Sequence, residues 1–149
     1  MAPPLPATLA LPHGWSRQDF GFLETTDTAE WIDWTNQTAK WVPRVFLWRF
    51  KAKEGYMRSV PSLHDTIADI LSTLRNENAK VFVSRAQTVC NGQRSGWFLS
   101  YIKTMDDPPL QFDETLFVDG ENIYRATYIR VVGQREDSKT REALNTLCT

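Results

Sequence analysis

The sequence predicts an α+β protein with a single antiparallel sheet of about six strands covered by helices, in the order β-β-(β)-α-β-β-β-β-α. Three observations support this fold class. The length of 149 residues suits one domain. A segment in the middle of the chain has the apolar periodicity of a helix, and the four segments after it have that of strands. Turn-forming dipeptides separate these strands at short intervals, as in a meander of hairpins.

The first third of the chain predicts strands after a short arm. Residues 1–12 contain four prolines and no apolar periodicity, so we expect a disordered Pro-rich arm followed by a single α+β domain over residues 13–149. The strands expected in this third are Trp15–Gln18, Phe20–Thr25, a segment near Glu30–Thr35, and Val45–Phe50. The last of these is the clearest, because it consists almost entirely of β-branched, aliphatic and aromatic residues.

The main helix is expected to begin after Ser62 and to end at Asn76–Asn78. Ser62 is a suitable N-cap, and Asp65 lies in the first turn, where the helix dipole favours a carboxylate. One apolar stripe runs through Leu63, Ile67, Ile70, Leu71 and Leu74.

Four strands and a second helix follow. The expected strands are Val81–Cys90, Gly96–Thr104, Leu110–Val118 and Ile123–Val132. Asn91-Gly92 and Asp119-Gly120 are hairpin turn signals. The second helix, Ser138–Leu147, is expected to direct Ala143, Leu144 and Leu147 towards the sheet.

Composition and charge exclude several classes of partner. Seventeen basic and eighteen acidic residues give a net charge of -1, whereas nucleic acids and anionic membranes usually select a basic surface. No stretch reaches the ~18 consecutive apolar residues of a transmembrane helix. We therefore expect no nucleic-acid partner and no transmembrane segment, and look to another protein as the partner.

The two cysteines suggest a location outside the cytoplasm. A disulfide between Cys90 and Cys148 is expected, and the alternative is two unconnected buried thiols. The first twelve residues lack Lys and Arg and do not form a signal peptide. We expect a secreted, periplasmic or lumenal protein in its mature form, with an added start Met. A cytoplasmic protein with a short arm is the alternative.

No catalytic, cofactor or metal motif is present. The sequence lacks GxGxxG, GxxxxGK[ST], GxSxG and HExxH. Its two histidines, His13 and His64, are expected in a loop and on the solvated side of a helix. Asp106-Asp107 precedes two prolines and is expected in an exposed turn rather than at a cation. The sequence thus predicts neither an enzyme nor a bound cofactor or metal.

Tryptophans are concentrated in the first third of the chain. Trp15 and Trp48, together with the later Trp97, are expected to pack in the core. Trp31, Trp34 and Trp41 lie among polar residues and are the candidate binding residues, with core packing as the open alternative.

Polar side chains also occur within the predicted strands. They are Arg85, Gln87, Lys103, Glu114 and Arg125. On a sheet with one solvated face such residues face water and form cross-strand charge pairs. If helices leave that face uncovered, it is a polar and aromatic surface on which a partner can dock.

The order of these elements resembles the PsbP/Mog1-like α+β superfamily. The similarity rests on the segment LPHGW at 11–15, the helix Ser62–Leu74, the turn Asn91-Gly92 before an aromatic strand, and the hairpin FVDGENIY at 117–124 before a C-terminal helix. It covers about residues 11–147. No functional motif of the family matches at a specific position, so no site residue is carried over.

The resemblance implies a non-catalytic protein that docks to other proteins, since most members act in that way and several are exported. We therefore expect an extracytoplasmic protein-binding or assembly domain. The alternative is an NTF2-like protein that binds or hydrolyses a small molecule in a pocket lined by Trp31, Trp34 and Trp41. That alternative requires a deep apolar cavity with convergent polar groups.

Overall fold

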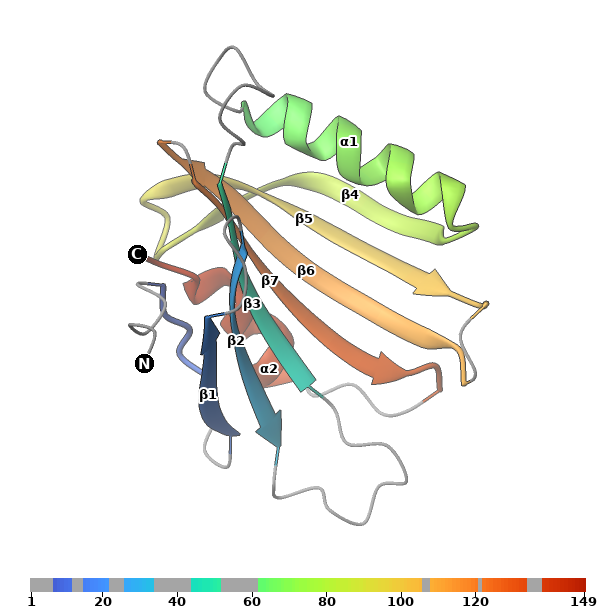
Figure 1. Ribbon diagram of the computed structural model, residues 1–149, viewed down its shortest axis with the longest axis horizontal. Coiled ribbons are helices and arrows are strands. Elements are labelled where there is room, and N and C mark those ends of the chain that lie inside the picture. The colour runs from blue at the N-terminus through green and yellow to red at the C-terminus, as the bar shows by residue number, and fades with distance from the viewer. Residues whose placement is uncertain are drawn as a thin grey trace.

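A computed structural model describes residues 7–11, 15–21, 26–33, 44–51, 62–105, 108–120, 122–133 and 138–149. In this part of the chain, seven strands form one antiparallel sheet in the order β1-β2-β3-β7-β6-β5-β4 (Figure 1). The strands are β1 (Trp15–Gly21), β2 (Thr26–Asp33), β3 (Arg44–Lys51), β4 (Lys80–Val89), β5 (Arg94–Lys103), β6 (Leu110–Asp119) and β7 (Asn122–Val131). The helices are α1 (Leu63–Asn76), α2 (Ser138–Ala143) and the 3-10 turn η2 (Leu144–Thr146). The predicted α+β class with a single antiparallel sheet is confirmed, with seven strands instead of about six.

The boundaries in the first third differ from the prediction. Two strands were expected at 15–18 and 20–25, but β1 continues without a break to Gly21. The strand expected near 30–35 begins earlier, at Thr26. β2 pairs with β1 on one side and β3 on the other. Its position inside the sheet explains why a polar, Thr-containing segment is extended, because backbone pairing on both edges outweighs weak side-chain periodicity.

Helix α1 has the predicted caps. The Ser62 Oγ accepts a hydrogen bond from the Asp65 backbone N at 3.0 Å. At the other end Asn78 adopts a left-handed φ of 57°, and the Ala79 backbone N donates to the Leu74 carbonyl at 2.9 Å. These contacts satisfy backbone groups that a helix end leaves unpaired, which fixes both ends of the helix.

The two predicted hairpin turns are present. Gly120 has a φ of 60° and lies between Asp119 and Asn122, which pair at the end of the β6–β7 ladder. The β4–β5 turn places Cys90, Asn91 and Gly92 at positive φ. Both turns join neighbouring antiparallel strands, so they fix the register of four of the seven strands.

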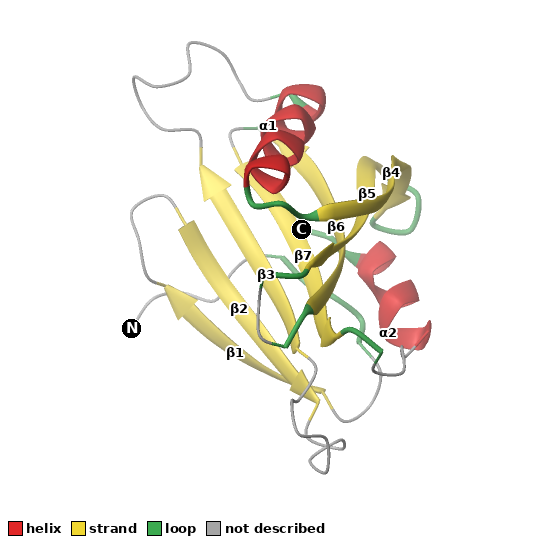
Figure 2. Cartoon of the chain, turned by 90° about the vertical axis from the view of Figure 1, so that its right-hand side faces the viewer, coloured by secondary structure: helices red, strands yellow, loops and turns green. Residues whose placement is uncertain are grey.

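Helices cover part of each face of the sheet. Helix α1 packs on one side, called here the α1 face, while α2 and η2 pack on the opposite side, called the α2 face (Figure 2). The buried core of the α1 face consists of Ile67, Leu74, Leu99, Tyr101 and Leu116. The core of the α2 face contains Ala7, Val45, Leu47, Val89, Phe117, Tyr124, Ala126, Tyr128, Leu144 and Leu147. Both helices lie towards the β4–β6 side of the sheet, away from β1 and β2 (Figure 2).

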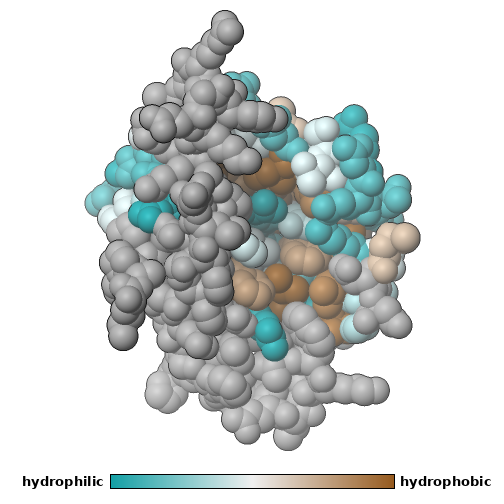
Figure 3. Space-filling model, viewed as in Figure 1, coloured by the Kyte–Doolittle hydropathy of each residue, from teal (hydrophilic) through white to brown (hydrophobic). Residues whose placement is uncertain are grey.

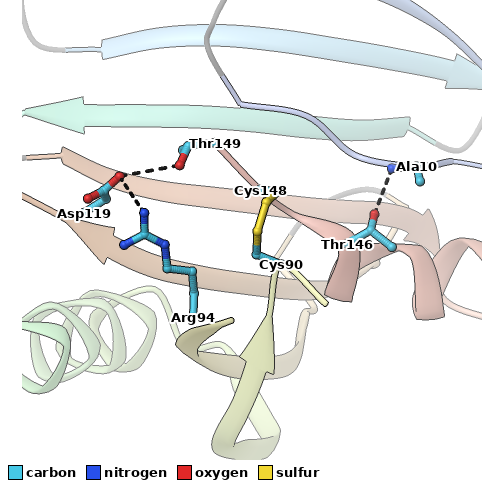
Figure 4. Close-up of a disulfide and its surroundings, with 7 residues drawn as sticks. All are labelled: Ala10, Cys90, Arg94, Asp119, Thr146, Cys148 and Thr149. Atoms are coloured by element: carbon cyan, nitrogen blue, oxygen red, sulfur yellow. Dashed lines mark hydrogen bonds and ion pairs between the residues drawn. A yellow bond between two sulfur atoms is a disulfide. The ribbon is translucent and has the colours of Figure 1, made fainter. Parts of the chain in front are cut away.

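The C-terminus is attached to the sheet and to an N-terminal segment. Cys90, at the end of β4, forms a disulfide with Cys148, and their Cα atoms are 4.6 Å apart (Figure 4). The Thr8 backbone N donates to the Cys148 carbonyl at 2.7 Å, and the Cys148 N donates back to the Thr8 carbonyl at 3.1 Å. Ala10 donates to the Thr146 Oγ1 at 2.8 Å.

Part of the segment expected to be a disordered arm is therefore ordered. Residues 7–11 pack against the C-terminal segment, and Ala7 is completely buried in the core of the α2 face. The prolines nearby argue for disorder only when the segment is considered alone. The contact partner lies at the far end of the chain, so local pattern does not show it.

Candidate binding surface on the α1 face

The α1 face is only partly covered by its helix. Helix α1 packs over β5 and β6 and leaves neighbouring parts of β3 and β7 uncovered by a described helix. Phe46, Trp48, Ile123 and Ile129 are half-buried there. In Figure 3, brown apolar groups lie between the polar surface of α1 and the grey region. We call these four residues, with Arg125, the open face.

The register explains why these side chains share one surface. Trp48 of β3 lies opposite Arg125 of β7, and Phe46 lies opposite Thr127. Alternate residues of a strand point to the same face, so Ile123, Arg125 and Ile129 also share it. Phe46 and Trp48 contact each other, with ring centroids 5.5 Å apart.

A buried charged cluster lies beside the open face. The Arg125 guanidinium donates to both carboxylate oxygens of Glu114, through Nη2 to Oε1 at 2.7 Å and through Nε to Oε2. Thr127 Oγ1 donates to Glu114 Oε2 at 3.2 Å, and Arg125 Nη2 donates to Tyr101 Oη at 3.3 Å. Glu114 has no exposed surface. The fork geometry makes this a strong and directional ion pair.

The expectation that the polar strand residues face water is thus wrong for Glu114. Glu114, Arg125 and Lys103 lie on the α1 face, but Arg85 and Gln87 lie on the α2 face, where Gln87 donates to Asn145 of η2. The reason is that helices partly cover both faces, so a polar residue in a central strand has no free access to water. It is satisfied by another side chain instead.

Burial and charge fix the protonation of Tyr101 and Arg125. Burial is the main cause that raises the pKa of Tyr101, and Glu114 raises it further, while Arg125 acts in the opposite direction. Burial lowers the pKa of Arg125, but Glu114 and Tyr101 more than offset this and leave that pKa above its ordinary value. Near neutral pH Tyr101 is therefore a neutral hydroxyl and Arg125 is a fixed cation.

A cavity of about 220 Å³ opens between α1 and the sheet. It is lined by Asp69, Ile70, Thr73, Leu74, Glu77, Tyr101, Lys103 and Arg125. Lys103 Nζ and Glu77 Oε2 form an ion pair across it at 2.7 Å. The charged groups make this lining more polar than that of a typical small-molecule pocket, which is mostly apolar.

The raised pKa of Tyr101 predicts alkaline destabilisation. A group whose pKa is raised on folding stabilises the native state below its unfolded pKa, about 10 for tyrosine, and loses this contribution as pH rises beyond it. We expect the free energy of unfolding of the wild type to fall more steeply above pH 10 than that of Tyr101→Phe, by up to about 1.4 kcal/mol per pH unit. Urea unfolding of both proteins at pH 9 to 11.5 measures this difference, and parallel profiles would contradict it.

The side chains of the candidate tryptophans lie outside what the structure describes. Trp31 lies in β2, opposite Val45 of β3 in register, and only its backbone is described. Trp34 and Trp41 lie outside the described residues, as do His13 and Asp106-Asp107. None of the residues that line the cavity is a tryptophan. A binding role for Trp31, Trp34 and Trp41 therefore stays a prediction.

The chemistry of the cluster favours recognition over proton transfer. Glu114 is paired with a fixed cation, and a tyrosine with a raised pKa is a poor base or nucleophile near neutral pH. His64 is exposed on α1, with its ring 6.4 Å from that of Trp97. Within the described ranges, no group of three or more His, Cys, Asp or Glu residues is arranged to hold a metal ion. Nor does any helix of the described residues have the length and apolarity to span a membrane.

Comparison with known proteins identifies the fold. No family model matches the chain, and no curated protein matches its sequence. The solution structure of cyanobacterial PsbP (CyanoP) from Synechocystis sp. PCC 6803 matches with a TM-score of 0.55 and 11% identity, over 85% of this chain and 75% of that chain. The chain therefore has a PsbP-like fold, and the predicted resemblance is confirmed at the level of the fold.

Proposed function

We propose that this protein is a non-catalytic, extracytoplasmic domain that binds a protein partner through the open face. The observation that carries this proposal is that no helix of the described residues covers the β3–β7 part of the α1 face, where Phe46, Trp48, Ile123 and Ile129 are half-buried around Arg125. Interface cores are enriched in aromatic residues and arginine, and such anchors supply most of the binding energy when a partner removes them from water.

The ion pair makes Arg125 a suitable anchor. Glu114 holds the guanidinium by two hydrogen bonds, so the side chain loses little conformational freedom when a partner binds. The side chain of Arg125 is 21% exposed. Its Nε and Nη2 atoms are engaged with Glu114 and Tyr101, which leaves Nη1 without a hydrogen-bond partner among the described side chains and available for an acceptor on another protein.

The cysteine pair supports a secreted, periplasmic or lumenal location. Structural disulfides persist in oxidising compartments and are rare in the cytosol. Alkylation of intact protein with and without reductant, followed by mass measurement, tests this. Two thiols that react without reductant in freshly isolated native protein would contradict the extracytoplasmic assignment.

Site-specific crosslinking tests the binding role. A photoactivatable residue replaces Ile123 or Ile129 on the open face, or Ala68 on the exposed side of α1 as the control. We expect the first two to capture one common protein in the native host and the third to capture none. Ile129→Lys should then weaken binding of that purified protein by about tenfold or more, with Ala68→Lys unchanged. Capture of different proteins at the two open-face positions, or equal binding by both lysine variants, would contradict the proposal.

Thermal unfolding of each variant separates binding from folding. Both lysine substitutions are placed at positions that are not fully buried, so we expect each to retain a cooperative transition. Weaker binding by Ile129→Lys supports the proposal only if this variant and Ala68→Lys have the same folded fraction at the assay temperature.

A further inference from the structure

We propose that the outer edge of β4 binds an extended acidic segment of a partner protein, which adds to the sheet as a further strand. This surface is separate from the open face, because β4 ends the sheet and the open face lies on β3 and β7. The inference thus goes beyond the proposed function, and each of the two can fail without the other.

Strand β4 has an unpaired backbone edge. It pairs with β5 on one side, and no strand of the described residues lies on the other. Along 80–88 no backbone hydrogen bond to another described segment occupies the outer side. Seven of its ten side chains are exposed, unlike those of the neighbouring β5. An edge of this kind can pair with an incoming strand through main-chain hydrogen bonds.

A bulge and a lysine protect one end of β4. The register with β5 is irregular between Val81 and Val83, around Phe82, and Lys80 lies next to this bulge. Bulges and lysines are common devices that prevent edge pairing. From Val83 to Thr88 the register is regular and no proline occurs, so six consecutive residues are suitable for pairing.

The charges on this edge select an acidic partner. Lys80 and Arg85 are the charged residues of β4, and both are basic. Arg85 has Gln87 as its hydrogen-bond partner, at 3.4 Å, and no acidic partner among the described residues. Its Cζ lies 5.4 Å from the centroid of the Phe98 ring. A guanidinium in the middle of the strand, without an acidic partner among the described residues, favours a carboxylate on an incoming strand.

The same charges argue against a second copy of this chain. Two β4 strands that pair antiparallel around the middle of the strand bring Arg85 of one copy close to Arg85 of the other. Like charges at such positions destabilise strand pairing. An acidic segment avoids this repulsion, and an apolar residue at its end can contact Phe82, which is 52% exposed.

Synthetic ten-residue peptides test the proposal. The probe is a β-prone peptide with glutamate at alternate positions and one terminal leucine, and the control is the same peptide with lysine in place of glutamate. We expect the acidic peptide to bind the full chain and the basic one not to bind, as measured by fluorescence anisotropy. Equal binding of both peptides, or binding of neither, would overturn the proposal.

Two further measurements identify strand addition as the mode of binding. Two versions of the acidic peptide are methylated at the backbone nitrogens of its odd-numbered or of its even-numbered residues. Only one edge of the added strand faces β4, so one version should lose binding and the other should keep it. Bound peptide should slow amide hydrogen exchange in 83–88. Equal effects in the two methylated versions, or unchanged exchange in 83–88, would overturn the proposal, as would self-association that protects these amides without peptide.

A charge reversal with a matched control completes the test. We expect Arg85→Glu to weaken binding of the acidic peptide by about tenfold or more. Arg75→Glu makes the same change at an exposed position of α1 and should leave the affinity within about twofold of wild type. Equal losses in the two variants would indicate attraction by net charge alone and would overturn the proposal.

Discussion

Replacement of Cys90 and Cys148 by alanine is expected to lower the free energy of unfolding by about 4 kcal/mol. The two residues are separated by 58 positions, and a crosslink over a loop of this length removes much of the conformational freedom of the unfolded chain. The loss is large relative to the 5–15 kcal/mol that typically stabilises a domain. Urea unfolding of the wild type and the double variant at pH 7 measures it.

Comparison with the reduced wild type controls for the removed sulfur atoms. We expect the reduced protein to unfold at nearly the same urea concentration as the double variant, because both lack the crosslink. In the reduced wild type we also expect faster amide exchange at Thr8 and Cys148 than in the oxidised protein. The backbone hydrogen bonds between these two residues depend on the position of the C-terminal segment. A double variant as stable as the oxidised wild type would show that the crosslink does not stabilise the fold.

Local signals predict the second half of the fold well. The α1 helix has a capping serine and one apolar stripe, and the β6–β7 hairpin has an Asp-Gly turn, so short-range chemistry determines these elements. In the first third, the identity of the strands depends on partners far away in the sequence. β3 pairs with β7, and residues 7–11 contact the C-terminal segment, which no local period reveals.

Cross-strand charge pairs were expected among residues that include Glu114 and Arg125, but in contact with water, and the Asp113–Arg130 pair was missed. The Asp-Gly turn sets the β6–β7 register, in which Glu114 lies opposite Thr127 and Leu116 lies opposite Arg125. Glu114 and Arg125 are therefore diagonal neighbours on one face, close enough for long side chains to meet. Opposite charges at diagonal positions of a predicted hairpin indicate such a pair. The same signal does not show that the pair is buried, because its burial depends on where the helices pack.

The central position of β6 explains why both of its faces contain a buried charge. Residues 113–117 are all buried, with Glu114 directed to the α1 face and Asp113 to the α2 face. In a sheet with one solvated face, buried and exposed residues alternate along each strand, so such a sheet would not have five consecutive buried residues. Each carboxylate is satisfied by an arginine from β7, so the β6–β7 hairpin provides a charge partner on both sides of the sheet.

Disruption of the Asp113–Arg130 pair is expected to be as costly as loss of the disulfide. Arg130 Nη1 donates to Asp113 Oδ2, and Ser100 Oγ donates to Asp113 Oδ1 at 2.6 Å. The two charged side chains are only 2% and 4% exposed. We expect Arg130→Met to lower the free energy of unfolding by about 3–5 kcal/mol, because it leaves a buried carboxylate without its counter-charge. Urea unfolding at pH 7 measures the loss.

A double variant and a surface pair make this prediction specific to burial. Asp113→Asn combined with Arg130→Met removes both charges, and the asparagine still accepts from Ser100, so we expect the double variant to be more stable than Arg130→Met alone. The exposed pair Arg94–Asp119, at 3.4 Å with side chains 42% and 39% exposed, is the matched control. Arg94→Met should cost no more than about 1 kcal/mol. Equal losses in Arg130→Met and Arg94→Met would mean that water reaches Asp113, and that the α2 face is less closed over β6 than its packing indicates.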